Sequence, residues 1–193
     1  MSQDLYLGYL RLKEYAQETS LTLSYGLVTN TAKKEGYIDE KSFIIEINGK
    51  NNFVAALFGN LYIIFCKNEA FKSSDSINRI KNIVGDSEAL LIVEHNKPNK
   101  LDTLLAEMKP HYNYMYLVSF VIKPFNNIFS PLNISLCDYD SLQKIIFFEK
   151  KDLSEISFWD PVIAYYRYKP GQVIEVVDAN LSCGKSVSYR YVI

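Results

Sequence analysis

The chain has 193 residues, a formal net charge of −1, 48% hydrophobic residues and 22% charged residues. This is the composition of an ordinary globular protein, and it excludes disorder as the main state. A folded chain of this length buries roughly 70% of its unfolded surface, which suffices for one core or for two small ones. The balanced charge gives the free chain no overall attraction for nucleic acid or anionic lipid.

The cysteines and the apolar segments favour a protein of a reducing compartment. Cys66, Cys137 and Cys183 are odd in number and far apart, so we expect no disulfide framework. No apolar run approaches the ~20 residues of a membrane span, and the first residues lack the features of a signal peptide. Lysine outnumbers arginine 17 to 4, and there are 19 Ile, 15 Asn and 15 Tyr. These residues have AT-rich codons, which indicates the AT-rich genome of a protist or a large DNA virus.

The first part of the chain begins with a predicted helix over residues 4–17, where apolar residues recur at helical spacing. Residues 18–40 are polar and mixed, with a short helix expected near Thr31–Glu35. Two strands are then expected at Ser42–Ile47 and Phe53–Phe58, joined by the hairpin signal of residues 48–52.

The following elements alternate between strands and helices. Strands are predicted at Leu61–Cys66, Ala89–Val93 and Met115–Ile122, and helices at Ser73–Val84 and Lys100–Met108. Ser73 or Ser74 caps the first of these helices, and Gly85 ends it. Such an order predicts a layered α/β domain around a mixed sheet.

A break at Lys123–Asn127 indicates a domain boundary, which divides the chain into domains 1–125 and 126–193. The predicted elements of the second domain are a helix capped by Asp138 or Asp140 that presents Leu142, Ile145 and Ile146, a helix opened by Asp160-Pro161, a turn at Lys169–Gly171, and strands at Gly171–Val177 and Ser186–Ile193. The predicted fold class is therefore α+β with two domains.

The strand Val173–Val177 is apolar at both parities. A strand that is covered on both faces has this pattern, which is hard to arrange within ~68 residues without a partner. The pattern thus favours a docking surface, while a sheet covered entirely by its own chain remains the alternative.

No pattern of catalytic, metal-binding or cofactor-binding residues emerges, so we expect no catalytic residue, metal or cofactor. His95 and His111 are the only histidines, and the chain has no CxxC, GxSxG, Walker or GxGxxG motif. A divergent metal-dependent nuclease stays open as an alternative, because acidic-x-Lys triplets occur at Asp39–Lys41, Glu107–Lys109 and Glu149–Lys151. None of the triplets lies clearly within a strand beside a second acidic residue.

The loop over residues 95–100 is a candidate nucleic-acid contact. It carries Lys97 and Lys100 and leads from a buried strand into a helix N-terminus, an arrangement that can meet phosphates. Two lysines add little affinity by themselves, and an ordinary solvated loop has the same composition.

A specific resemblance begins in the last third of the chain. Its residues include Asp160-Pro161-Val162, then Lys169-Pro-Gly171-Gln172-Val173, and finally Gly184-Lys-Ser-Val-Ser-Tyr189-Arg190. The ungapped run from Asp160 to Arg190 resembles the C-terminal assembly module of the fifth subunit shared by nuclear RNA polymerases I, II and III, which has a counterpart in archaeal RNA polymerase. Residues 1–125 resemble the eukaryotic jaw domain in size, position and element order, and Leu91–Asn99 resembles its strand and loop facing downstream DNA.

Several positions depart from the family pattern. Arg167 stands where a glycine is usual, Pro170 and Asp178 replace basic residues, Leu181 replaces a glutamate, and Ser186 replaces a tyrosine. The turn glycines, Asp-Pro and Tyr-Arg are kept, so the fold is expected to persist while partner contacts have changed. Together with the composition, this favours a viral homologue.

The resemblance implies a non-catalytic subunit of a multisubunit DNA-directed RNA polymerase. Residues 126–193 would dock on the largest subunit, and residues 1–125 would form part of the jaw beside downstream duplex DNA, near Lys97 and Lys100. The assembly motif is expected at Asp160, Pro161, Gly171, Gln172, Val173, Gly184, Tyr189 and Arg190. Other polymerase subunits are further expected partners, and the location would be virion and host cytoplasm for a virus, or the nucleus for a cell. A free-standing transcription regulator that uses the same module is the other alternative.

Overall fold

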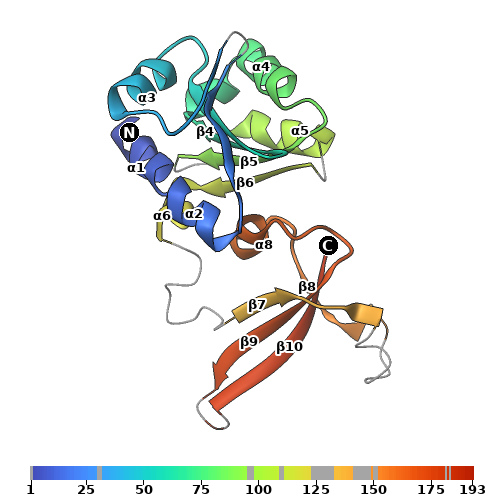
Figure 1. Cartoon of the computed structure of the whole chain (residues 1–193). Coiled ribbons are helices and arrows are strands. Elements are labelled where there is room, and N and C mark those ends of the chain that lie inside the picture. Colours follow the sequence, from blue (N-terminus) through green and yellow to red (C-terminus); the bar gives the residue numbers. More distant parts are fainter. Residues whose placement is uncertain are drawn as a thin grey trace. The chain divides into compact units, whose positions relative to one another are not determined.

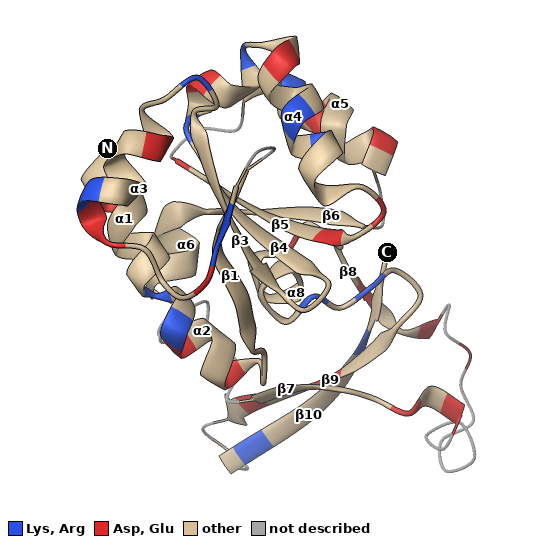
Figure 2. Ribbon diagram, turned by 45° about the horizontal axis from the view of Figure 1, so that its top comes forward, with Lys and Arg blue, Asp and Glu red and all other residues tan. Residues whose placement is uncertain are grey.

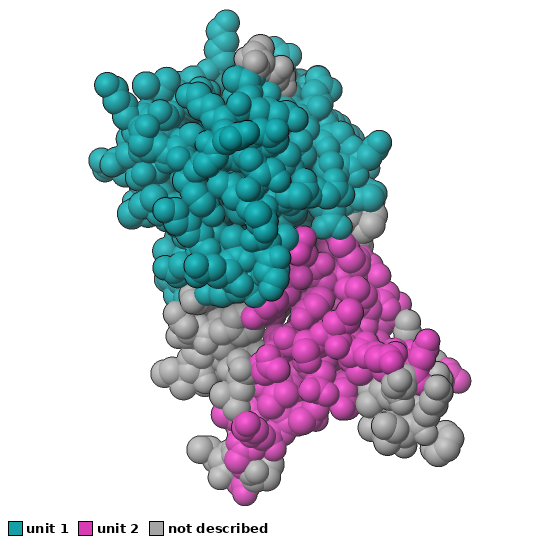
Figure 3. All heavy atoms as spheres, in the orientation of Figure 1, with its two compact units in different colours: residues 1–122 teal, residues 123–193 magenta. Residues whose placement is uncertain are grey.

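The computed structural model describes residues 2–29, 32–94, 98–108, 111–122, 133–140, 149, 152–180, 182 and 184–193. The chain divides into two compact units, Met1–Ile122 and Lys123–Ile193 (Figures 1 and 3). The predicted boundary segment Lys123–Asn127 lies outside the described residues. In the described part of the chain, no helix has the length and hydropathy needed to cross a membrane.

Unit 1 is built on a six-stranded mixed sheet with the order β2-β1-β3-β4-β5-β6. Its strands are β1 (Leu23–Val28), β2 (Lys33–Lys34), β3 (Phe53–Phe58), β4 (Leu61–Cys66), β5 (Glu88–Val93) and β6 (Tyr112–Tyr116). The strands β3 and β4 pair antiparallel, whereas β4, β5 and β6 run parallel. The edge strand β2 carries two exposed lysines, which discourage pairing with another chain.

Helices cover both faces of this sheet. They are α1 (Ser2–Leu10), α2 (Leu12–Glu18), α3 (Glu40–Ile47), η1 (Asn68–Phe71), α4 (Ser74–Val84), α5 (Asn99–Met108) and α6 (Leu117–Ile122). Figure 1 shows α1, α2, α3 and α6 on one face and α4 and α5 on the other. The predicted helix over residues 4–17 is confirmed, with an irregularity at Arg11, whose N–H still donates to the Gly8 carbonyl at 3.1 Å.

A cluster of aromatic rings packs between the sheet and the first helices. Tyr9 is fully buried, and its ring lies 5.2 Å from that of Phe43 and 5.9 Å from that of Phe65. Its hydroxyl donates to the Gly26 carbonyl at 2.9 Å and accepts from the Ile38 N–H at 3.1 Å. Burial raises the pKa of Tyr9 to about 12. One phenol therefore joins α1, β1 and the segment before α3.

Glycine is required where β1 meets the segment that precedes α3. A Cβ on Gly26 would lie 1.8 Å from the Gly36 carbonyl oxygen and 2.8 Å from the Tyr9 hydroxyl. Backbone cannot yield to such a contact at low cost, so Gly26 sets the close approach of these segments.

The predicted strand Ser42–Ile47 is wrong, because these residues belong to the helix α3. Asp39 caps the helix by accepting from the Ser42 N–H at 2.8 Å, and Phe43 and Ile47 are both fully buried. Ile45 lies between them and is 62% exposed, so the apolar period is helical rather than alternating. The predicted hairpin over residues 48–52 is wrong for the same reason. The real hairpin joins β3 to β4 through Gly59-Asn60, where Gly59 has a positive φ.

Two other expectations for unit 1 are wrong. A short helix is expected near Thr31–Glu35, but Lys33 and Lys34 form the edge strand β2 instead. The strand β1 lies within residues 18–40, where the sequence predicts no strand. Leu21, Leu23, Tyr25 and Leu27 alternate with other residues, a signal typical of a strand. The predicted strand Met115–Ile122 ends at Tyr116 and continues as α6.

The remaining predicted elements of unit 1 are confirmed. Strands occur at Leu61–Cys66 and Glu88–Val93, and helices at Ser74–Val84 and Asn99–Met108. Ser73 caps α4 by accepting from the Asp75 N–H at 3.2 Å, and Gly85 ends the helix with φ of +57°.

Unit 2 is a four-stranded mixed sheet with the order β7-β9-β10-β8. Its elements are β7 (Asn133–Leu136), β8 (Ser154–Ile156), α8 (Pro161–Tyr166), β9 (Val173–Asn180) and β10 (Gly184–Val192). The buried core consists of Ile134, Phe158, Ile163, Ile174, Val176 and Val192. The helix and the two long strands were predicted and are confirmed, whereas β7 and β8 were not predicted. The expected helix presenting Leu142, Ile145 and Ile146 lies outside the described residues.

The predicted fold class is confirmed, since the described chain is α+β with a mixed sheet in each of two units.

Candidate assembly surface and nucleic-acid interface

Helix α8 is bounded by the residues that the sequence singled out. Asp160 accepts from the Val162 N–H at 2.8 Å, and Pro161 occupies the first turn, where its missing N–H has no cost. Arg167 ends the helix in the left-handed conformation, with φ of 60° and ψ of 33°. Glycine is the residue that adopts this conformation most easily, so Arg167 holds it at a conformational cost.

The turn after α8 ties the start of β9 to the end of β10. Gly171 has φ of +90°, and its N–H donates to the Val192 carbonyl at 2.9 Å. The Gln172 side chain accepts from the Lys169 N–H at 2.6 Å, and the Gln172 carbonyl accepts from the Val192 N–H at 3.0 Å. The residues Gly171 and Gln172 thus have structural roles at this turn.

The hairpin of β9 and β10 brings the rest of the motif together. Val173 lies opposite Tyr191, and Arg190 lies between Ile174 of β9 and Ser154 of β8. Gly184 begins β10 with φ of +78°, which a residue with a side chain adopts only under strain.

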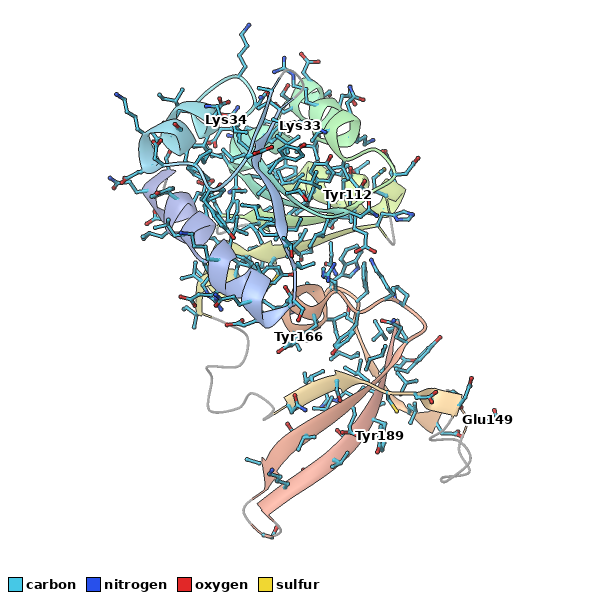
Figure 4. The ribbon with its side chains drawn as sticks, viewed as in Figure 1. Lys33, Lys34, Tyr112, Glu149, Tyr166 and Tyr189 are labelled. Atoms are coloured by element: carbon cyan, nitrogen blue, oxygen red, sulfur yellow. The ribbon has the colours of Figure 1, made fainter. Side chains whose placement is uncertain are left out.

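Tyr189 lies on β10 (Figure 4). In the pairing of β10 with β9 it is directly opposite Glu175. Its hydroxyl donates to the Glu175 carboxylate at 3.2 Å. Burial raises the pKa of Tyr189, and the carboxylate of Glu175 raises it further, so the phenol stays protonated and able to donate.

The two faces of this sheet differ. Ile174, Val176 and Val192 point to the core. By alternation the opposite face, which we call the outer face, carries a buried Val173 together with Glu175, Val177, Val187, Tyr189 and Tyr191. Val187 is 53% exposed, and Val177, its cross-strand partner, is half-buried. The outer face therefore presents valine and tyrosine side chains around one polar pair.

In unit 1, lysines and an arginine gather where β4 and β5 end, and we call this set the cationic edge: Lys67, Lys72, Arg79 and Lys100. The Lys100 ammonium donates to the Lys72 carbonyl at 3.2 Å, and Arg79 donates to Asn51 at 2.5 Å. Lys67 contacts Asn48. Figure 2 shows Lys and Arg interspersed with Asp and Glu on this end of the unit.

A buried carboxylate holds the loops of the cationic edge together. Glu94, at the end of β5, is 4% exposed and accepts from the Asn68 N–H at 3.0 Å. The loop that contains Lys67 and Lys72 is thereby joined to the start of the loop over residues 95–100. Lys97 lies outside the described residues, whereas Lys100 is described and exposed in the first turn of α5.

Sequence reasoning selected Lys100 but missed Lys67, Lys72 and Arg79. Lys67, which directly follows β4, was separable from other basic residues by one rule, that the carboxyl ends of parallel strands meet at the same edge of a sheet. Applying it required the parallel pairing of β4 and β5, which the sequence did not specify.

The acidic-x-Lys triplets do not form a metal centre within the described residues. Asp39 caps α3, and Glu107 on α5 pairs with Lys81 on α4, while Lys109 and Lys151 lie outside the described residues. In the described ranges, no three His, Cys, Asp or Glu side chains gather in a way that could hold a metal ion.

Comparison with known proteins assigns the C-terminal unit. Residues 136–192 match the family model described as RNA polymerase Rpb5, C-terminal domain. No curated protein matches the chain. The matched segment begins at the end of β7 and includes β8, α8, β9 and β10, together with every predicted motif residue from Asp160 to Arg190. Residues 136–192 are therefore similar to an Rpb5 C-terminal domain, and this similarity supports an Rpb5-like RNA polymerase subunit.

Proposed function

We propose that the chain is a non-catalytic subunit of a multisubunit DNA-directed RNA polymerase and that its C-terminal unit docks on the largest subunit. The observation that carries this proposal is the Rpb5 C-terminal domain over residues 136–192, in which the motif residues form caps, turns and strand pairs.

The outer face of the C-terminal sheet is the surface that we assign to docking. Valine and tyrosine bury apolar area, and tyrosine is enriched at protein interfaces, where its hydroxyl keeps a polar partner. The Tyr189–Glu175 hydrogen bond already satisfies that hydroxyl within the sheet. A partner that covers this face would therefore add apolar contacts without leaving the phenol unpaired.

The test is the variant Val187→Lys, assayed for binding to the purified largest subunit of the same enzyme. Covering an unpaired charge at the centre of an interface costs several kcal/mol, so we expect binding to fall at least tenfold. Ile45→Lys is the matched control, because Ile45 is 62% exposed on α3 of the other unit. Equal binding by the two variants would contradict docking through the outer face, and unchanged Trp159 fluorescence would show that the unit remains folded.

We further propose that unit 1 lies beside downstream duplex DNA as part of the jaw, with the cationic edge and Lys97 facing phosphates. The support is that Lys67 and Lys72, from the segment after β4, and Lys100, from the first turn of α5 after β5, lie at one end of the sheet. Lysines at such an edge attract the DNA backbone without reading its sequence.

Charge reversal in the assembled polymerase tests this second proposal. The triple variant Lys72→Glu/Lys97→Glu/Lys100→Glu should reduce crosslinking to downstream DNA several-fold and leave subunit assembly intact. The double variant Lys33→Glu/Lys34→Glu on the edge strand β2 is the control, because these two exposed lysines lie outside the cationic edge. Unchanged crosslinking by the triple variant would remove the jaw assignment without affecting the docking proposal.

The viral origin is likewise our proposal. It is supported by the bias towards residues with AT-rich codons and by Pro170 and Asp178, which stand where the resemblance leads us to expect basic residues. On this view the subunit resides in the virion and the host cytoplasm, and a cellular homologue would instead reside in the nucleus.

A further inference from the structure

An apolar groove lies between α1 and α6 of unit 1. It is a hollow of about 380 Å³ lined by Asp4, Leu7, Leu117, Val118, Val121 and Ile122. Leu7 is 59% exposed, Val118 55% and Ile122 57%. Side chains of this size are costly to leave in water when they lie together.

These exposed side chains are not part of the buried core of unit 1. Helix α6 buries Leu117 and Phe120, and the Phe120 ring packs against Tyr15 and Phe65 at 5.3 and 6.0 Å. Val118, Val121 and Ile122 lie on the other side of the same short helix. Of nine large apolar side chains exposed in the described chain, five belong to α1 and α6: Leu7, Leu10, Val118, Val121 and Ile122.

The side of the groove formed by α1 and continued by α2 is rich in acidic residues. Asp4, Leu7, Arg11, Glu14 and Glu18 follow one another at spacings of three or four, so they line one side of the nearly continuous helices α1 and α2. Arg11 pairs with both glutamates, with Glu14 at 2.8 Å and Glu18 at 3.1 Å. Three carboxylates and one guanidinium lie along this side, so acidic side chains outnumber basic ones there.

The area of the exposed apolar side chains on α1 and α6 favours a single helix as the binding partner over a second copy of the chain. Five side chains that are about half exposed offer roughly 400 Å² of apolar surface, whereas a stable dimer buries about 800 Å² on each partner. A single amphipathic helix in a groove needs only a row of apolar anchors at helical spacing. A symmetric dimer would also bring the two acidic sides towards each other.

We propose that this groove binds one amphipathic helix of a partner protein. The helix carries large apolar side chains at i, i+3, i+4 and i+7, and lysine or arginine along the flank that faces Asp4 and Glu14. This interaction is independent of the docking of the C-terminal unit and of contact with DNA.

The proposal is tested with the full chain and a pair of fluorescent model peptides. Both peptides are helical, with leucines at i, i+3, i+4 and i+7, and one has lysine flanks where the other has glutamate. We expect the lysine peptide to bind at least tenfold more tightly in anisotropy measurements at low salt. The double variant Asp4→Asn/Glu14→Gln should remove that preference, because it removes the charges that distinguish the peptides.

Apolar variants locate the site. The double variant Leu7→Ser/Val118→Ser should bind the lysine peptide at least tenfold more weakly than the wild type. The control Ile45→Ser, which changes a similarly exposed apolar residue of α3, should bind the peptide with unchanged affinity. Both positions of the double variant are exposed, so circular dichroism should show an unchanged fold. Failure of the lysine peptide to bind, equal binding of the two peptides, or equal effects of the two apolar variants would overturn the proposal. Sedimentation of the wild-type chain as a dimer that Leu7→Ser/Val118→Ser dissociates would assign the groove to a second copy instead.

Discussion

Replacing Arg167 by glycine should stabilise the C-terminal unit, because this residue ends α8 with φ of 60°. The left-handed conformation costs a residue with a Cβ about 1–2 kcal/mol. Glycine avoids that cost but loses about 0.5–1 kcal/mol more conformational freedom on folding. The net gain is about 0.5–1 kcal/mol, which corresponds to a rise of about 2–8 °C in Tm for a unit of this size.

The unfolding of the C-terminal unit can be followed by itself. Trp159 is the single tryptophan of the chain, and its ring lies 4.9 Å from that of the core residue Phe158. Urea unfolding monitored by tryptophan fluorescence therefore reports on this unit. Arg167→Ala is the matched control, since alanine keeps the Cβ and hence the backbone cost. The reasoning is refuted if Arg167→Ala stabilises the unit as much as Arg167→Gly does.

Three further predictions concern caps and buried hydroxyls. Asp160→Ala should destabilise the C-terminal unit by about 1 kcal/mol, and Asp160→Asn much less, because asparagine can still accept from the Val162 N–H; equal losses in the same urea assay would contradict the capping role. Tyr9→Phe should cost unit 1 about 1–3 kcal/mol, because the Ile38 N–H loses its acceptor, and hydrogen exchange of the Ile38 amide should accelerate, whereas unchanged protection would contradict this account. Because the pKa of Tyr9 is about 12 in the folded chain and about 10 when unfolded, its contribution is complete below pH 10 and is lost as the pH rises to about 12. Alkaline unfolding followed by circular dichroism should show that loss in the wild type and a smaller one in Tyr9→Phe, and identical curves would refute the linkage.

Local signals in the sequence predicted the elements that have their own caps and turns. Asp160-Pro161 opens α8, Ser73 and Gly85 bound α4, and Gly171 makes the turn before β9. In each case a side chain or a glycine determines the conformation of its neighbours in sequence, so no distant contact has to be known. The family resemblance has the same basis, since it rests on the ordered turn and cap residues of the C-terminal unit.

Elements that depend on distant partners could not be predicted in the same way. The strands β7 and β8 have four and three residues and exist through pairing with β9 and β10. The apolar run of α3 suits a strand or a helix, and only the burial of Phe43 and Ile47 around an exposed Ile45 decides between them.

The candidate surfaces show the same limit. Lys100 was found because it follows a strand and begins a helix, whereas its neighbour Lys72 comes from a different loop and reaches it only through the parallel pairing of β4 and β5. The groove between α1 and α6 joins residues more than a hundred positions apart. Because the sequence predicts a strand where α6 lies, the exposed side of that helix could not be foreseen.

The most direct test of the central claim is purification of the tagged chain from its native source, with quantitative mass spectrometry of the copurifying proteins. The account predicts recovery with the two large subunits of a DNA-directed RNA polymerase in equal amounts, and loss of both in the Val187→Lys variant. Recovery of the wild-type chain alone, or with unrelated factors, would contradict the claim that its C-terminal unit is a docking module of the polymerase.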